Sequence, residues 1–145
     1  MTDNEQNTSS KKQQDSSGSS SVWWWTFGSV PEVSPQQMKQ LVSTSKENGT
    51  PLQIVDVRTE SEFVQGHIEG AVNCSFLPNV FSFSSRMTEL PLDKTKPVYT
   101  ICLSAHRSIA AVKWLRERGF EAYQLQGGMK AWRLENLEEV VEKKE

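Results

Sequence analysis

Short apolar runs along the chain alternate with segments whose apolar residues recur at helical spacing. The runs are four to six residues long and rich in Val, Ile and Leu, which is typical of buried strands. They lie at Leu52–Val57, Ala71–Cys74, Val98–Ile101 and Ala122–Leu125. The helical segments lie at Gln36–Ser45, Glu60–Gln65, Arg107–Arg118 and Leu134–Lys144. Strands that alternate with helices predict an α/β fold with a mostly parallel central sheet flanked by helices.

Capping residues indicate where the first of these helices begins and ends. Ser34 is a favourable N-cap and Pro35 suits the first helical position, while Asn48-Gly49 is a typical stop. A short helix is expected after Gly127-Gly128. The Leu134–Lys144 segment is predicted to be an amphipathic helix, because its apolar residues fall on one stripe.

The N-terminal part of the chain differs from the rest in composition. Met1–Ser21 has no aliphatic residue after Met1, so we expect a disordered tail. Residues 22–32 form an aromatic lead-in that contains Trp23, Trp24 and Trp25. We favour an edge segment that packs on the domain; the alternatives are an exposed docking patch for a protein partner and a membrane contact. Residues 33–145 are predicted to form one domain.

Composition narrows the possible functions. The 145 residues suit a single domain, and the net charge of −2 gives no general attraction to nucleic acid. Cys74 and Cys102 lie far apart without metal-ligand spacing, so we expect no metal, no disulfide framework and a reducing, cytoplasmic compartment. No apolar run approaches the ~20 residues that span a membrane. The N-terminus contains Asp3 and Glu5 and has no apolar core, so we do not expect a secretory signal there.

The segment Cys102-Leu103-Ser104-Ala105-His106-Arg107-Ser108 carries the most specific chemistry. It follows the predicted strand Val98–Ile101 and leads into the predicted helix after it. A tight loop that ends at a helix N-terminus stabilises an anion or a thiolate through backbone N–H groups and the helix dipole. A thiolate is the nucleophilic form of cysteine, so Cys102 is the candidate nucleophile.

Four motifs in order resemble those of the single-domain rhodaneses, a sulfurtransferase family. They are Ile54–Arg58, Glu62–Asn73, Cys102–Ser108 and Gly127–Trp132, and the match runs from about Val33 to Trp132. The resemblance implies a rhodanese-like α/β fold, a persulfide on Cys102 and no metal or organic cofactor. It also implies that the loop Leu103, Ser104, Ala105, His106, Arg107 and Ser108 binds a small anionic sulfur donor, thiosulfate or a persulfide.

The chemistry of sulfur transfer fits this loop. A thiolate attacks the outer sulfur of the donor, and the resulting persulfide is passed to a thiol, cyanide or a protein acceptor. Backbone amides of the loop stabilise the anion, and Arg107 suits an oxyanion or sulfonate. The alternatives are an inert buried Cys102 and a surface charge at Arg107. A rhodanese-like interaction or sulfur-relay module with little turnover is the alternative for the whole protein.

The loop departs from the family at two positions, and its length argues against a related class of enzymes, the phosphatases. Glycine is usual where Ala105 stands, so a positive φ there would cost of order 1 kcal/mol. Histidine is less usual in the family where His106 stands. Its side chain is expected to tune the thiolate, to contact the acceptor or simply to face solvent. Phosphatases of related fold have five residues between cysteine and arginine, whereas here Arg107 follows Cys102 after four.

Three further features have structural and functional interpretations. Asp56 and Arg58 are expected to support the site as an internal ion pair rather than to act on substrate. His67 is expected to be a hydrogen-bonded structural residue. Cys74 is expected to be a small buried apolar residue, with a resolving thiol for Cys102 as the alternative.

Overall fold

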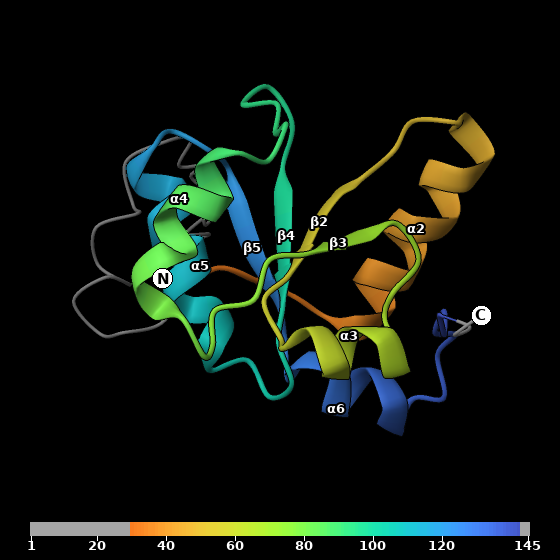
Figure 1. Cartoon of the computed structure of the whole chain (residues 1–145). Coiled ribbons are helices and arrows are strands. Elements are labelled where there is room, and N and C mark those ends of the chain that lie inside the picture. Colours follow the sequence, from red (N-terminus) through yellow and green to blue (C-terminus); the bar gives the residue numbers. More distant parts are fainter. Residues whose placement is uncertain (1–29, 143–145) are drawn as a thin grey trace, which may run out of the picture.

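A five-stranded parallel sheet forms the centre of the molecule in the computed structural model, which describes residues 30–142 (Figure 1). Its strands are β1 (Glu32–Val33), β2 (Gln53–Asp56), β3 (Ala71–Asn73), β4 (Val98–Ile101) and β5 (Ala122–Leu125). The order across the sheet is β1-β5-β4-β2-β3, and every described pairing is parallel. All five carboxyl ends therefore meet at one edge, the lower end in Figure 1.

Helices cover both faces of the sheet. They are α2 (Pro35–Asn48), α3 (Glu60–Gln65), α4 (Phe83–Thr88), α5 (Arg107–Glu117) and α6 (Gly128–Leu134), with a 3-10 turn at Val80–Ser82 before α4. Figure 1 shows α4 and α5 on one face, and α2 and α6 on the other. The predicted α/β architecture, with a parallel sheet between helices, is thus confirmed.

Two apolar clusters fill the layers on either side of the sheet. The first joins alternate strand residues to α4 and α5, and includes Val55, Val98, Phe83 and Leu115. The second joins the other strand faces to α2 and α6 through Met38 and Trp132 among others. Alternation of side chains along each strand assigns neighbouring residues to opposite clusters, so all four residues of β4 are buried.

Most predicted elements and caps are confirmed. Helix α3 and strands β4 and β5 have the predicted bounds. Ser34 caps α2 as predicted, since its Oγ accepts a hydrogen bond from the Gln37 backbone N–H at 3.1 Å. Gly49, with φ 65°, ends α2 in the left-handed conformation that favours glycine.

The predicted helix over Leu134–Lys144 is wrong for the described part of that segment. Helix α6 ends at Leu134, and Asn136 takes a left-handed φ of 53° that stops it. The chain then runs extended, and Val140 pairs with His67 through two backbone hydrogen bonds of 2.7 and 2.9 Å. The apolar residues of this segment do not form a buried stripe: Leu137 packs against the core, but Leu134 is 85% exposed and Val141 61%.

Two predictions concern the ends of the chain. Met1–Ser21, predicted to be a disordered tail, and the aromatic residues Trp23, Trp24 and Trp25 lie outside the described residues, so their predicted roles stay predictions. The first described residue, Val30, is buried in the cluster beneath α5. Within residues 30–142, no helix combines the length and the apolar character that crossing a membrane requires.

Candidate active site

Cys102 follows β4 directly and lies at the base of the loop that leads to α5. It is 1% exposed, at the edge of the sheet where the strands end. Two backbone hydrogen bonds join this loop to the start of α6. The Met129 N–H donates to the Cys102 carbonyl at 2.8 Å, and the Lys130 N–H donates to the Leu103 carbonyl at 3.0 Å. Gly128 permits this approach, since a Cβ there would lie 2.6 Å from the Leu103 carbonyl.

The loop turns sharply at Ala105. This residue has φ 65°, so the fourth loop position does require the conformation in which glycine is usual. The side chain of Ser104 then hydrogen-bonds to Nδ1 of His106 at 2.9 Å, and His106 is exposed. Helix α5 begins at the next residue, Arg107, so the loop runs into a helix N-terminus as predicted.

The side chain of Ser108 contacts the sulfur of Cys102. Its Oγ lies 3.3 Å from Sγ and 2.7 Å from Oε1 of Gln124. The Nε2 of Gln124 in turn donates to Oε2 of Glu32 at 2.9 Å. The sequence predicted Ser108 as part of the loop but gave no signal for Gln124, which lies on a strand and is buried.

Arg107 forms a two-pronged ion pair with Glu62 of α3. Nη1 and Nη2 of Arg107 donate to the two carboxylate oxygens of Glu62 at 3.0 and 3.1 Å. The guanidinium, together with hydrogen bonds from Thr59, lowers the pKa of Glu62 from 4.5 to about 2. The charge of Arg107 is therefore balanced by a neighbour that the sequence analysis had not paired with it.

Asp56 and Arg58 form the internal ion pair that was predicted. Arg58 Nη2 lies 2.7 Å from Asp56 Oδ2, and both side chains are fully buried. The same Nη2 donates to the Gly66 carbonyl at 2.7 Å, and Asn73 Nδ2 donates to the carbonyls of Asp56 and Arg58. This network joins the end of β2 to α3 and β3, beside the loop.

These features can be compared with known proteins. The sequence model of the rhodanese-like domain matches residues 34–135, which is most of the chain. The chain belongs to the rhodanese-like domain family. The match begins at the N-cap of α2 and ends one residue after α6.

Relatives and solved structures agree with that family. YtwF of Bacillus subtilis, named as a candidate sulfurtransferase, is 32% identical over 108 residues, 71% of this chain and 90% of that one. The thiosulfate sulfurtransferase GlpE of Pseudomonas aeruginosa is 30% identical over 102 residues, 70% of this chain and 82% of that one. A rhodanese-like domain protein of Staphylococcus aureus has a TM-score of 0.58 at 26% identity, covering 71% and 91% of the two chains. Together they support a sulfurtransferase family.

Two further residues that the sequence analysis considered, His67 and Cys74, are buried in this rhodanese-like domain. His67 is buried, stacks on Phe63 with ring centroids 3.8 Å apart, and has Nδ1 2.8 Å from the Phe63 carbonyl. Cys74 is a free, buried thiol, and burial raises its pKa. No disulfide joins the two cysteines, and residues 30–142 contain no group of three or more His, Cys, Asp or Glu that could hold a metal.

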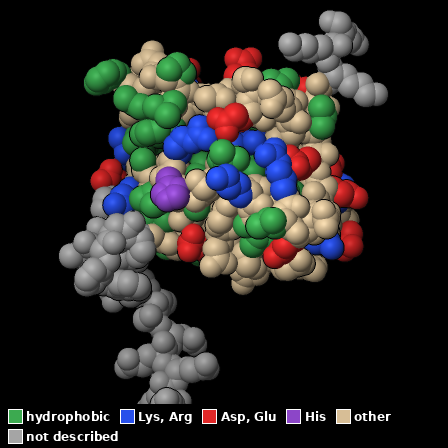
Figure 2. Space-filling view, turned by 90° about the horizontal axis from the view of Figure 1, so that it is seen from below, with side chains coloured by type: hydrophobic (Ala, Val, Ile, Leu, Met, Phe, Trp, Pro, Cys, Tyr) green, Lys and Arg blue, Asp and Glu red, His purple; other side chains and the backbone are tan. Residues whose placement is uncertain are grey.

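The face that carries the loop is mixed in charge. Figure 2 views the carboxyl end of the sheet and shows Lys and Arg side chains across the middle of this face, interleaved with acidic ones. The charges on this face therefore do not form a patch of a single sign.

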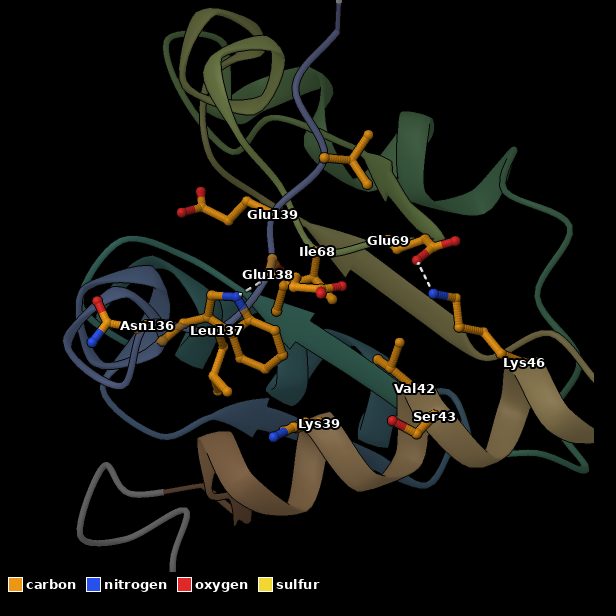
Figure 3. Close-up of a pocket in the computed structure, with 12 residues that line it drawn as sticks. Lys39, Val42, Ser43, Lys46, Ile68, Glu69, Asn136, Leu137, Glu138 and Glu139 are labelled. Carbon is orange, nitrogen blue, oxygen red and sulfur yellow. Dashed lines mark hydrogen bonds and ion pairs between the residues drawn. The ribbon is translucent and has the colours of Figure 1, made fainter.

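A cavity of about 370 Å³ lies elsewhere, between α2 and the segment after α6 (Figure 3). Its lining includes Lys46 and Glu69, which form an ion pair of 2.7 Å between exposed side chains. No residue of the loop 102–108 lines it. The candidate site at the loop is therefore separate from this cavity.

Proposed function

We propose that the protein is a sulfurtransferase that moves sulfane sulfur from an anionic donor to a thiophilic acceptor through a persulfide on Cys102. The observation that carries this proposal is the position of Cys102, at the end of β4 and at the base of a loop that bends through Ala105 into α5. Such a loop turns several N–H groups toward one point and stabilises an anion without a metal.

The reaction has two balanced half-reactions. In loading, the Cys102 thiolate attacks the outer sulfur of thiosulfate, an S–S bond forms to Sγ, and sulfite leaves with the electron pair of the broken S–S bond. In unloading, cyanide or a thiolate attacks the outer sulfur, and the electron pair of the Sγ–S bond returns to Sγ as thiolate. No net oxidation or reduction of the protein is required.

The loop residues have separate roles in this proposal. The segment Leu103, Ser104, Ala105, His106, Arg107 and Ser108 surrounds the outer sulfur, and its backbone N–H groups stabilise the charge. Arg107 orients the donor, whose anionic end shares the guanidinium with Glu62. Asp56 and Arg58 support the loop from the end of β2, where their ion pair is buried.

The Glu62–Arg107 pair favours a second candidate function, a sulfur-relay module that is slow with thiosulfate. A small dianion meets a guanidinium whose two terminal nitrogens, Nη1 and Nη2, already donate to a carboxylate. A persulfide donor carries less charge and depends less on Arg107. Under this alternative the physiological donor and acceptor are a persulfide and a thiol, one of them on a protein.

Turnover of thiosulfate and cyanide to thiocyanate tests the proposal and separates the candidates. We expect turnover in the wild type, complete loss in Cys102→Ser, and wild-type rates in the matched control Cys74→Ser. Arg107→Ala should raise KM for thiosulfate about tenfold or more, the range for a hydrogen bond to a charged group. Slow thiosulfate turnover with rapid loading from glutathione persulfide would favour the relay, and turnover retained in Cys102→Ser would exclude both.

The proposed setting is a reducing, cytoplasmic compartment. Both cysteines are free thiols, and an oxidising compartment would put the reactive one at risk. The proposed reaction needs no cofactor, since the loop supplies the charge stabilisation.

A further inference from the structure

The hydroxyl of Ser108 lies between two hydrogen-bond acceptors. Its Oγ is 3.3 Å from Sγ of Cys102 and 2.7 Å from Oε1 of Gln124. Ser108 is fully buried, Cys102 is 1% exposed and Gln124 is 4% exposed. A serine hydroxyl has one hydrogen, so it donates to the sulfur or to the amide oxygen, but not fully to both.

Glu32 determines which end of the Gln124 side chain faces Ser108. Glu32 and Gln124 are register partners on the neighbouring strands β1 and β5. Gln124 Nε2 donates to Glu32 Oε2 at 2.9 Å. A carboxylate at neutral pH only accepts hydrogen bonds, so the NH₂ group must point toward Glu32 and the carbonyl oxygen toward Ser108.

The charge on Sγ decides where the Ser108 hydrogen goes. When Cys102 is a thiol, its S–H donates to Ser108 Oγ, and Ser108 donates to Gln124. When Cys102 is a thiolate, the hydroxyl donates to the sulfur, because hydrogen bonds to charged groups are the stronger ones. Gln124 Oε1 then loses its donor in a buried position, which is unfavourable. Each state satisfies a different set of partners.

We propose that Gln124, oriented by Glu32, is a positioning residue that withdraws the Ser108 hydroxyl from Sγ and so favours sulfur loading over sulfur release. The inference rests on the proposed function. In loading, negative charge leaves Sγ for the outer sulfur and the departing sulfite, and the hydroxyl returns to Gln124. In unloading, the electron pair returns to Sγ, and the Ser108 hydroxyl must again give up its hydrogen bond to Gln124 in order to donate to Sγ.

Two variants remove the competition in different ways. Gln124→Met keeps the size of the side chain and removes the acceptor. Glu32→Gln changes an exposed residue into one that can donate to Oε1 of Gln124, so that the amide can turn its NH₂ toward Ser108. We expect slower loading from thiosulfate and faster unloading to cyanide in both, by about twofold to about tenfold in Gln124→Met and less in Glu32→Gln. A general loss of structure would slow both half-reactions.

The rate of Cys102 alkylation by iodoacetamide, measured across pH, tests the competition between Sγ and Gln124 for the Ser108 hydroxyl without any sulfur transfer. The half-maximal rate should move to lower pH in Gln124→Met and Glu32→Gln, and to higher pH in Ser108→Ala. The charged groups next to the loop, Arg107 with Glu62 and Asp56 with Arg58, are the same in every variant. Glu32→Gln removes one further negative charge, whereas Gln124→Met and Ser108→Ala leave every charged group in place. Half-reaction rates are compared on the high-pH plateau, where every variant is fully thiolate.

Two controls make the assignment specific. Glu121→Gln removes a carboxylate just before β5 that bonds to Tyr123 and not to Gln124, and it should behave as the wild type. In a Ser108→Ala background, Gln124→Met should change nothing further, because the shared hydroxyl is gone. An alkylation profile and half-reaction rates equal to the wild type in Glu32→Gln would overturn the inference. Failure of the wild type to load sulfur would overturn the proposed function, while the alkylation profiles would still decide this inference.

Discussion

Ala105 occupies the sharpest bend of the loop. Its φ of 65° lies in the region where a Cβ crowds the backbone, at a cost of roughly 1–2 kcal/mol for residues other than glycine. The surrounding contacts, from the start of α6 to the Ser104–His106 hydrogen bond, hold this bend in place.

At this position glycine should stabilise the fold. Ala105→Gly removes the Cβ strain but adds freedom to the unfolded chain, so we expect a net gain of about 0.5–1 kcal/mol in the free energy of unfolding. Urea unfolding measures it. The matched control is Ala110→Gly in α5, which should lose about 1 kcal/mol as glycines in helices do. A loss of similar size in Ala105→Gly would contradict the strain.

Side-chain contacts could be predicted from the sequence only where the residues are close along the chain. Asp56 and Arg58 are two residues apart at a strand end, and their ion pair was predicted. Glu62 and Arg107 are 45 residues apart, and their meeting depends on how α3 sits beside the loop. Gln124 was not predicted either, because an isolated polar residue in a strand does not reveal which helix residue lies above it.

The Glu62–Arg107 pair joins two elements, the N-terminal turn of α3 and the first residue of α5. Glu62 also closes the capping box of α3, since its carboxylate accepts from Thr59 while its own N–H donates to Thr59 Oγ1 at 3.2 Å. One carboxylate thus fixes a helix start and the loop arginine together. Loss of its charge should weaken both.

The pH dependence of stability should reveal this link. The pKa of Glu62 is about 2 in the fold against an ordinary value of 4.5, so its contribution is complete above pH 4.5 and lost as the pH falls toward 2. The free energy of unfolding of the wild type should exceed that of Glu62→Gln at pH 6, and the difference should shrink as the pH falls to 2. Glutamine retains the capping geometry, so the comparison isolates the charge.

The control for that comparison is Glu60→Gln, which removes a neighbouring charge from the same first turn of α3. Its difference from the wild type should be the smaller one at pH 6. A difference between wild type and Glu62→Gln that stays constant from pH 6 to pH 2 would contradict the ion pair.

Elements with mostly buried residues, and helices with clear caps, were the predictable ones. Strands β4 and β5 lie in the middle of the sheet, where burial on both faces leaves an apolar run in the sequence. The segment after Leu134 misled because its apolar spacing suits a helix. There the tertiary contacts decide: Trp132 Nε1 donates to the Glu138 carbonyl at 3.0 Å, and Val140 pairs with His67.

At the scale of the whole molecule, the parallel sheet collects loops from distant parts of the chain at one end. The end of β2 supplies the Asp56–Arg58 pair, and the segments after β4 and β5 supply the cysteine loop and the start of α6. Four motifs in the sequence predicted this assembly through a family resemblance. The aromatic lead-in at residues 22–32 has no counterpart in those motifs, so the resemblance predicts no role for it.

Truncation tests whether the aromatic lead-in packs on the domain. Val30, the first described residue, is buried in the same apolar cluster as Ala111, Val112 and Leu115 of α5. Deleting Met1–Ser21 should leave the unfolding midpoint unchanged, whereas deletion through Phe27 should lower stability by roughly 1.5–3 kcal/mol if one indole is buried. Equal midpoints for the two truncations would refute packing and favour a docking role for Trp23, Trp24 and Trp25.

The most direct test of the account is the mass of the intact protein after brief exposure to excess thiosulfate. We predict a gain of one sulfur atom, located on the peptide that contains Cys102, and its complete removal by cyanide with release of thiocyanate. Cys74→Ser should gain the same mass, and Cys102→Ser should gain none. An added sulfur on Cys74, or no added sulfur from thiosulfate or from glutathione persulfide, would contradict the assignment of Cys102 as the sulfur carrier.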